Sequence, residues 1–400
     1  MKILHLSNTA GRLGGGVGEV IKSLLYYQTK ITSKSHLWFM GSDNLINELS
    51  KDSKVIKSRI KAINPLCGIK NTISPFFLLK KNKVSKDYQI LHQHGLFLPI
   101  SIFTLLLNNI KIIINPHGYL EPEKLKVSKL KKKFILWLFE RKNLQNCHCL
   151  IACSNQEATS LRDWGLTQPI VILPNGIDDS LLRKTIVVNT KLDFKAKYNI
   201  KNDSKILLFL SRVHPFKGLE LLLESILAIK EHFRNSDWVF VIAGPDELNH
   251  TKKLKSIVNN QNIEDIVKFV GPQYNNDKYL SIDSADCFIL PSKGENFGIV
   301  VIEALARGIP VISTKNTPWS ELIDYSCGWW IDRTKEDFKS VLLKLINTDS
   351  KSLLKMGKNG ISLVEKKYLW SKITQQSIQV YKWVLNDFNP KFKKGFSLFE

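Results

Sequence analysis

The chain has 400 residues and a formal net charge of +22, with 44% hydrophobic and 24% charged residues. At about 100 to 200 residues per domain, this length predicts two to four globular domains with sizeable cores. The positive charge favours an anionic partner such as nucleic acid, anionic lipid or a phosphorylated substrate. Six cysteines are too few for a disulfide scaffold, and we expect neither a secretory leader nor a membrane-spanning helix. The composition therefore predicts a cytoplasmic protein.

Short apolar runs alternate with segments of helical length in the first half of the chain. The run K-I-L-H-L at residues 2–6 is followed by a glycine-rich loop and then by apolar residues at helical spacing. This alternation indicates a layered α/β domain with a parallel sheet. Further strands are predicted at residues 36–40, 89–92, 111–115 and 149–153.

A second domain of the same kind begins with the run K-I-L-L-F-L at residues 205–210. Turn-forming and charged residues replace the apolar periodicity between the two halves, which indicates a boundary. The sequence predicts an N-terminal domain at 1–178, a linker at 179–202, a C-terminal domain at 203–375 and a final helix at 376–400 that returns toward the N-terminal domain.

In open α/β sheets, ligands bind beyond the carboxyl ends of the strands, so the loops at that edge are the candidate sites. The first such loop, G-G-G-V-G at residues 14–18, precedes a helix. Its glycines would let backbone N–H groups approach an anion at the helix terminus. The spacing is not that of the dinucleotide fingerprint, and a simple tight turn explains the loop equally well.

The second loop, S-R-V-H-P-F-K-G at residues 211–218, places Arg212 and Lys217 between a strand and a helix. The planar fork of arginine and the point charge of lysine suit a diphosphate. Two solvated surface cations explain this loop about as well.

The third loop and its helix, residues 291–313, contain two carboxylates. Glu303 lies within an otherwise apolar helix, where a carboxylate is rarely buried without a partner, and Glu295 lies on the loop at the helix entrance. This pattern fits a ligand whose diphosphate meets the helix end and whose hydroxyls reach the carboxylates.

The segment G-E-N-F-G-I-V-V-I-E-A-L-A-R-G-I-P-V-I resembles the signature of the retaining glycosyltransferases of family 4, and S-R-V-H-P-F-K-G resembles their Arg/Lys loop. The glycine loop, I-N-P-H-G at residues 114–118 and P-N-G-I-D at 174–178 extend the resemblance over nearly the whole chain. It implies the GT-B fold, in which two Rossmann-like, doubly wound domains face each other across a cleft. The donor, a nucleotide-sugar, would bind the C-terminal domain, and the acceptor mainly the N-terminal one.

The resemblance also implies roles for individual residues, and Glu295, His117, Arg212 and Lys217 would be catalytic. It implies no metal and no cofactor. By the same resemblance, Arg212 and Lys217 would contact the donor diphosphate, and Glu303 would contact the ribose hydroxyls. Glu295 and the amides of Asn296, Phe297 and Gly298 would contact the transferred sugar, with His117 beside it. Gly15 and Gly16 would approach the phosphates.

Other details resemble bacterial surface-polysaccharide transferases, among them H-G-Y-L-E-P at residues 117–122, which would place Glu121 at an acceptor. Residues 121–142 hold eight Lys or Arg against three Glu, interleaved with aromatic and aliphatic residues. Such a segment can lie on an anionic leaflet, where a polyprenyl-linked acceptor resides. We therefore predict contact of residues 124–142 with the inner face of the cytoplasmic membrane, although a solvated lysine face explains the pattern equally well.

The sequence favours transfer of a sugar from a UDP- or GDP-sugar to a hydroxyl of a lipid-linked oligosaccharide, without nucleic acid as a partner. The alternatives are a GT-B nucleotide-sugar epimerase or hydrolase and, less well supported, a basic nucleic-acid-binding protein. Cys147, His148, Cys149 and Cys153 suggest zinc ligands, but alternate strand positions lie about 6.6 Å apart along one face, too far for one tetrahedral site. Buried thiols are the favoured interpretation.

Overall fold

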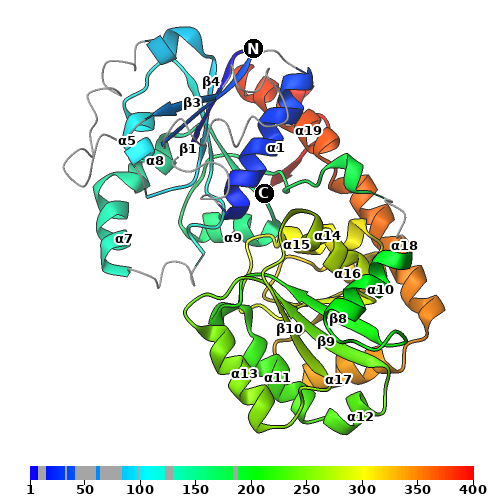
Figure 1. The fold of residues 1–400 in the computed structure, drawn as a ribbon. Coiled ribbons are helices and arrows are strands. Elements are labelled where there is room, and N and C mark those ends of the chain that lie inside the picture. Colours follow the sequence, from blue (N-terminus) through cyan, green and yellow to red (C-terminus); the bar gives the residue numbers. More distant parts are fainter. Residues whose placement is uncertain are drawn as a thin grey trace. The chain divides into compact units, whose positions relative to one another are not determined.

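The computed structural model describes residues 1–7, 15–31, 34–40, 60–63, 83–97, 99–121, 129–182 and 188–400. The chain divides into two compact units, residues 1–176 with 370–400 and residues 177–369. Each unit is built around its own sheet, which is wholly or largely parallel (Figure 1). The predicted pair of Rossmann-like α/β domains is therefore confirmed.

The sheet of the first unit has, among the described residues, the strand order β14-β7-β6-β5-β4-β1-β2-β3. All neighbours are parallel except β14, which pairs antiparallel with β7. Every residue of β1 and β4 is buried, as expected for central strands covered on both faces. The strands are β1 (Ile3–Ser7), β2 (Ser35–Met40), β3 (Ile60–Ile63), β4 (Ile90–His94), β5 (Lys111–Asn115), β6 (Cys149–Ala152), β7 (Ile170–Ile172) and β14 (Ser397–Phe399).

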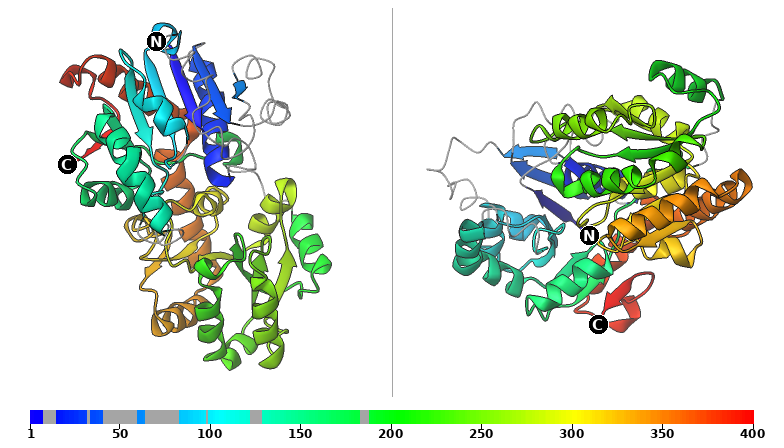
Figure 2. Two further views of the ribbon diagram at one scale, coloured as in Figure 1. Left: turned by 90° about the vertical axis from the view of Figure 1, so that its left-hand side faces the viewer. Right: turned by 90° about the horizontal axis from the view of Figure 1, so that it is seen from below.

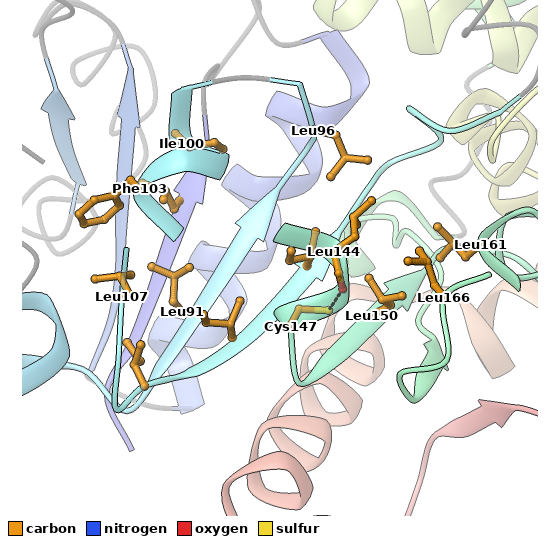
Figure 3. Packing of buried hydrophobic residues seen from close by; sticks show 14 of the residues in the cluster. Leu91, Leu96, Ile100, Phe103, Leu107, Leu144, Cys147, Leu150, Leu161 and Leu166 are labelled. Carbon is orange, nitrogen blue, oxygen red and sulfur yellow. Dashed lines mark hydrogen bonds between the residues drawn. The ribbon is translucent and has the colours of Figure 1, made fainter. Parts of the chain in front are cut away.

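Helices of the first unit pack on this sheet around an apolar core that includes Leu91, Phe103 and Leu150 (Figure 3). The last long helix, α19, packs against the first, α1, although they lie at opposite ends of the sequence (Figure 1). The helices are α1 (Gly15–Ile31), α5 (Pro99–Leu105), α7 (Lys129–Ile135), the π-helix η3 (Leu136–Glu140), α8 (Arg141–Asn146), α9 (Asn155–Asp163), α19 (Trp370–Leu385) and the 3-10 turn η6 (Pro390–Phe392).

The sheet of the second unit has the order β10-β9-β8-β11-β12-β13 and is parallel throughout. Its strands are β8 (Lys205–Leu210), β9 (Trp238–Ala243), β10 (Val267–Gly271), β11 (Cys287–Leu290), β12 (Val311–Thr314) and β13 (Gly328–Ile331). Long apolar runs such as that of β8 form these strands because helices cover both faces of the sheet (Figures 1 and 2).

Helices of the second unit pack in pairs: α11 contacts α17, α10 contacts α14, and α15 contacts α18. They are α10 (Val188–Lys197), α11 (Leu219–Leu227), α12 (Lys230–Arg234), α13 (His250–Asn260), α14 (Asn275–Ser284), α15 (Ile299–Ala306), α16 (Glu321–Asp324), α17 (Lys335–Ile346) and α18 (Ser350–Lys367), with the 3-10 turns η4 (Asp179–Leu181) and η5 (Pro215–Lys217).

The unit boundaries differ from those expected at the linker and near the C-terminus. The segment 179–202 was expected to be a linker, but it contains α10, which packs against α14 within the second unit. The chain passes back to the first unit at residue 370, where α19 begins. The sequence analysis did not predict α10, because this short helix has few apolar residues. Only one of its sides packs against the unit, so its apolar periodicity is weak.

Candidate active site

Each sheet has a point where the strand order reverses, and the loops at that point are the usual ligand site of an open α/β sheet. In the second unit the chain runs outward from β8 through β9 and β10, then returns to β11 on the other side of β8. In the first unit the reversal lies between β1 and β4. The loops after β8 and β11 are those that the sequence had singled out.

The loops after β8 and β11 are held against each other by backbone contacts. Gly218 has a φ of 77°, and a Cβ on it would lie 2.1 Å from the carbonyl oxygen of Pro291. The N–H of Lys293 donates to the carbonyl oxygen of Phe216 at 3.0 Å. The glycine is therefore needed both for its left-handed conformation and for the close approach of the two loops.

The best-buried ion pair at this point joins two predicted site residues, Lys217 and Glu295. Lys217 Nζ contacts Glu295 Oε1, and Ser292 Oγ donates to the same oxygen at 3.2 Å. The two charged side chains are only 12% and 16% exposed. Glu295 thus holds the ammonium group of Lys217 at the switch point, where a phosphate could replace part of this contact.

Arg212 is placed differently from Lys217. Its guanidinium is 62% exposed, and its Nη1 lies 2.5 Å from Glu247 Oε2. Arg212 and Lys217 therefore pair with two different carboxylates, Glu247 and Glu295. An exposed pair of this kind contributes about 0–1 kcal/mol, so Arg212 can exchange Glu247 for a phosphate at little cost. Glu247 was not singled out from the sequence, because one acidic residue in a loop carries no signal.

The helix that follows β11, α15, begins without a side-chain cap. Its N-cap is Gly298, which has a φ of 79°, and no side chain there bonds the first backbone N–H groups. A helix N-terminus carries partial positive charge that favours an anion. The Phe297 ring packs against Trp319, whose indole N–H donates to the Phe297 carbonyl oxygen at 2.6 Å. Phe297 and Trp319 therefore act in packing, and the backbone amides of residues 296–298 stay candidates for ligand contact.

Glu303, on α15, is 6% exposed and only half paired. Its Oε1 lies 2.5 Å from Nζ of Lys278 on α14, whereas its buried Oε2 has no hydrogen-bond partner among the described residues. A buried acceptor without a donor costs about 1–3 kcal/mol, so a hydroxyl-bearing ligand would be stabilised there. The buried carboxylate was predicted from the sequence; Lys278 was not, because its register on a separate helix is set by tertiary packing.

In the first unit, Gly15 and Gly16 are the first two residues of α1, and the preceding loop at 8–14 lies outside the described residues. His117 follows β5, has a φ of 53° and is 3% exposed. Its backbone N–H donates to Asn115 Oδ1 at 3.1 Å, and its ring Nε2 lies 3.0 Å from His94 Nδ1. The positions agree with strand-end roles, but the ligand contacts of all three residues stay predictions.

A buried carboxylate missed by the sequence analysis supports the His117 loop. Glu157, on α9, accepts from the backbone N–H of Gly118 and from that of Cys153 at 2.8 Å. Two backbone donors satisfy this carboxylate inside the unit, so it orders the loop rather than standing ready for a ligand.

Three further histidines gather in the central strands of the first unit. His5 of β1 and His92 and His94 of β4 place ring nitrogens within 4.8 Å of one another, the spacing of a group that could hold a metal ion. Burial lowers the pKa of His5 to about 4 and those of His92 and His94 well below 6.5. These rings are therefore neutral at physiological pH.

The cysteine cluster predicted to be thiols is buried. Cys147 Sγ donates to the Leu144 carbonyl oxygen at 3.1 Å, and burial raises the pKa of Cys149 to about 12. His148 Nδ1 accepts from the Ile112 backbone N–H at 3.1 Å. These contacts all lie within the first unit, where they stabilise its fold.

The predicted basic segment carries an exposed apolar stripe. Leu130, Phe134, Trp137 and Leu138 are 84%, 59%, 78% and 56% exposed and follow one another at helical spacing. Residues 122–128, which include Lys124 and Lys126, lie outside the described part of the chain. In the described residues no helix combines the length and apolarity that a membrane crossing requires.

Solved structures with the same architecture are GT-B glycosyltransferases. Anabaena HepE, solved in complex with UDP, has a TM-score of 0.75 at 15% identity, covering 96% of this chain and 100% of that chain. WaaG, a glycosyltransferase involved in lipopolysaccharide biosynthesis, has a TM-score of 0.69 at 16% identity, covering 95% and 99%. At these identities the likeness establishes the fold, which is GT-B.

The sequence families divide the chain in the same two parts. Residues 14–181 match Glycosyltransferase Family 4, and residues 190–363 match Glycosyl transferases group 1. The chain is thus built of these two glycosyltransferase family domains. The O-antigen biosynthesis glycosyltransferase WclY of Escherichia coli is 26% identical over 212 residues, covering 52% of this chain and 54% of the relative. The chain spans about half the length of the curated relatives it matches.

Proposed function

We propose that this chain is a retaining glycosyltransferase that moves a sugar from a UDP- or GDP-sugar to a hydroxyl of a growing, polyprenyl-linked bacterial polysaccharide or O-antigen unit. The observation that carries the proposal is the half-paired, buried carboxylate of Glu303 on α15, the helix that follows the switch-point loop containing Glu295. Support comes from HepE, which was solved with UDP, and from relatives named for O-antigen and lipopolysaccharide synthesis.

In the proposed reaction the bond between the anomeric carbon and the diphosphate breaks, the acceptor hydroxyl oxygen bonds to that carbon, and the hydroxyl proton passes to the leaving diphosphate. Lys217 and the N-terminus of α15 would stabilise the negative charge that develops on the leaving diphosphate, with Arg212 exchanging Glu247 for it. Glu303 Oε2 would accept from a ribose hydroxyl. His117 would contact the transferred sugar.

Replacing Glu303 with alanine is expected to weaken donor binding by about 1–3 kcal/mol, or roughly 5- to 150-fold, because ribose hydroxyls lose a buried acceptor. Calorimetric titration with UDP, GDP and their sugars measures this and identifies the base. Glu224→Ala removes an exposed carboxylate from the same unit and serves as the control. Donor affinity of Glu303→Ala within twofold of the wild type would remove the ribose role.

Transfer is expected to persist in EDTA, because fixed cations and the helix terminus neutralise the diphosphate in place of a metal. NMR of the product is expected to show the donor's anomeric configuration. An inverted product, or activity abolished by EDTA and restored by a divalent metal, would contradict these two parts of the proposal. Turnover of the donor without any acceptor would favour an epimerase or hydrolase.

We further propose that the segment 124–142 contacts an anionic membrane surface, with the exposed apolar stripe entering the interface. Each lysine near such a surface contributes about 1 kcal/mol. Replacing Lys131, Lys132 and Lys133 by glutamate is therefore expected to release the protein from anionic vesicles and to slow transfer to a lipid-linked acceptor, with donor binding unchanged. Vesicle co-sedimentation at physiological salt measures the release.

The matched control replaces Lys351, Lys355 and Lys358, three exposed lysines of α18 in the other unit, by glutamate. Both triple variants change the net charge of the protein by the same amount. A difference in vesicle binding between them therefore reports on the location of the lysines. Undiminished sedimentation of the Lys131, Lys132 and Lys133 variant would mean that this segment is a solvated face.

A further inference from the structure

A chain of buried polar side chains runs through the first unit to His117. Gln28 of α1 places Oε1 2.8 Å from His5 Nε2, and His5 Nδ1 lies 3.0 Å from His94 Nε2. His94 Nδ1 lies 3.0 Å from His117 Nε2. All four side chains are at most 3% exposed, so water does not compete for these contacts.

The direction of this chain is set at its far end by Ser377 of α19, the helix that lies beside α1 (Figure 1). Ser377 Oγ donates its single hydrogen to the Thr374 carbonyl oxygen at 2.7 Å. It must therefore accept from Gln28, 3.2 Å away, and the Gln28 atom facing it is the donor Nε2. The hydroxyl of Tyr381, also on α19, accepts from the same Nε2 at 3.2 Å. The acceptor Oε1 of Gln28 consequently faces His5.

Each ring in the chain then has one consistent tautomer. An amide oxygen only accepts, so His5 carries its hydrogen on Nε2 and accepts on Nδ1. His94 must donate from Nε2 to His5, which makes its Nδ1 an acceptor. His117 must donate from Nε2 to that acceptor. The proton on each neutral ring follows from the inventory of donors and acceptors along the chain.

We propose that Gln28, His5 and His94 are positioning residues that fix the tautomer and orientation of His117, with Ser377 and Tyr381 setting the direction. His117 then carries its hydrogen on Nε2, and Nδ1 accepts. Any group that bonds Nδ1 must therefore donate, as a sugar hydroxyl in the reaction proposed above would. The role at the sugar rests on the proposed function, whereas the tautomer does not.

A metal ion on His5, His92 and His94 is the competing explanation, and the unpartnered, buried Nε2 of His92 is the observation on its side. Zinc–nitrogen bonds of about 2.0–2.1 Å in a tetrahedron place ligand nitrogens roughly 3.3–3.4 Å apart. The 3.0 Å between His5 Nδ1 and His94 Nε2 is instead a hydrogen-bond distance. A metal would also strip the hydrogen from His94 Nε2, which would reverse the tautomer of His117.

The direct test is NMR of the intact protein with 15N-labelled histidine, in which ring correlations distinguish a protonated from an unprotonated nitrogen. The His117 signals are assigned by their loss in His117→Gln. We expect a protonated Nε2 and an unprotonated Nδ1 near neutral pH. A protonated Nδ1 would overturn the proposal, as would stoichiometric Zn²⁺ binding that shifts the signals of His5, His92 and His94.

Breaking the chain at a distance is the second test. Gln28→Met keeps the side-chain length but removes its polar atoms, and Ser377→Ala combined with Tyr381→Phe removes both hydroxyls that accept from Gln28 Nε2. We expect both variants to show mixed His117 tautomers, and Gln28→Met to raise the donor KM by about 2- to 10-fold, the value of one neutral hydrogen bond. His148→Gln, a change at a histidine outside the chain, is expected to alter neither.

An unchanged His117 tautomer in folded Gln28→Met and in folded Ser377→Ala combined with Tyr381→Phe would overturn the proposal, and the wild-type spectrum decides the matter even where a variant fails to fold. The two proposals fail separately. A protonated Nε2 in a protein without sugar transfer would leave the positioning chain standing and remove the proposed function. Sugar transfer by a protein with protonated Nδ1 would do the opposite.

Discussion

Replacing Lys217 with alanine is expected to lower turnover by about 10²- to 10³-fold, the usual worth of a preorganised charge at a leaving group. Lys217 is the better buried of the two predicted cations and is already held by Glu295, so little reorganisation precedes its contact with a diphosphate. Arg212→Ala is expected to lower turnover as well. Steady-state rates at saturating donor and acceptor measure both effects.

Lys253→Ala is the matched control for these variants. Lys253 is 64% exposed and lies 3.4 Å from Glu220, so its removal takes away a cation from the same unit without touching the switch point. Its turnover should stay near that of the wild type. Glu295→Gln in the Lys217→Ala background tests whether an unpaired glutamate causes the loss. Near-normal turnover in both Lys217→Ala and Arg212→Ala would place the phosphate site elsewhere.

The free energy of unfolding is expected to fall steeply as the pH drops from 6.5 toward 4. The pKa of His5 is about 4 in the folded chain against 6.5 for an ordinary histidine, because burial disfavours its charged form. The contribution of His5 to the free energy of unfolding is therefore fully present above pH 6.5. It is lost below that pH, as the histidine of the unfolded chain takes up a proton. His5 alone accounts for about 3 kcal/mol by pH 4.

His92 and His94, whose pKa values are also lowered by burial, add to this slope. Denaturant titrations between pH 6.5 and 5 measure this slope of the free energy of unfolding against pH. The range lies above the pH at which most carboxylates titrate. His5→Gln should reduce the slope by about one proton, or roughly 1.4 kcal/mol per pH unit. Glu140, whose pKa burial raises, acts in the opposite direction, and the comparison of variant with wild type cancels its contribution. A free energy of unfolding that stays constant over this range would mean that the histidines are not buried as neutral rings.

The polar residues within buried strands show where pattern reasoning stops. The strand predicted at residues 89–92 ended at His92, short of the polar residues Gln93 and His94. The strand continues to His94, and its two histidine side chains bond residues of β1, α19 and the loop after β5. Those partners lie up to 289 positions away in sequence, so no local sequence pattern predicts them.

The strands and loops, in contrast, depended on local features that a sequence displays. The apolar run at 205–210 becomes β8, and the run at 111–115 becomes β5, because strands covered on both faces are predominantly apolar. Glycines at positions such as Gly218 and Gly298 marked where the backbone takes a positive φ. The sequence by itself therefore determined the two α/β units, the loops at their switch points and the buried position of Glu303.

Only the tertiary structure decided which charges meet. It paired Glu295 with Lys217, Glu303 with Lys278 and Arg212 with Glu247, and it joined α19 to the unit that contains α1. It also aligned His5, His94 and His117 into one hydrogen-bonded chain. These arrangements depend on the relative register of elements far apart in the sequence, and side-chain contacts of a few ångströms follow from packing rather than from the periodicity of any one segment.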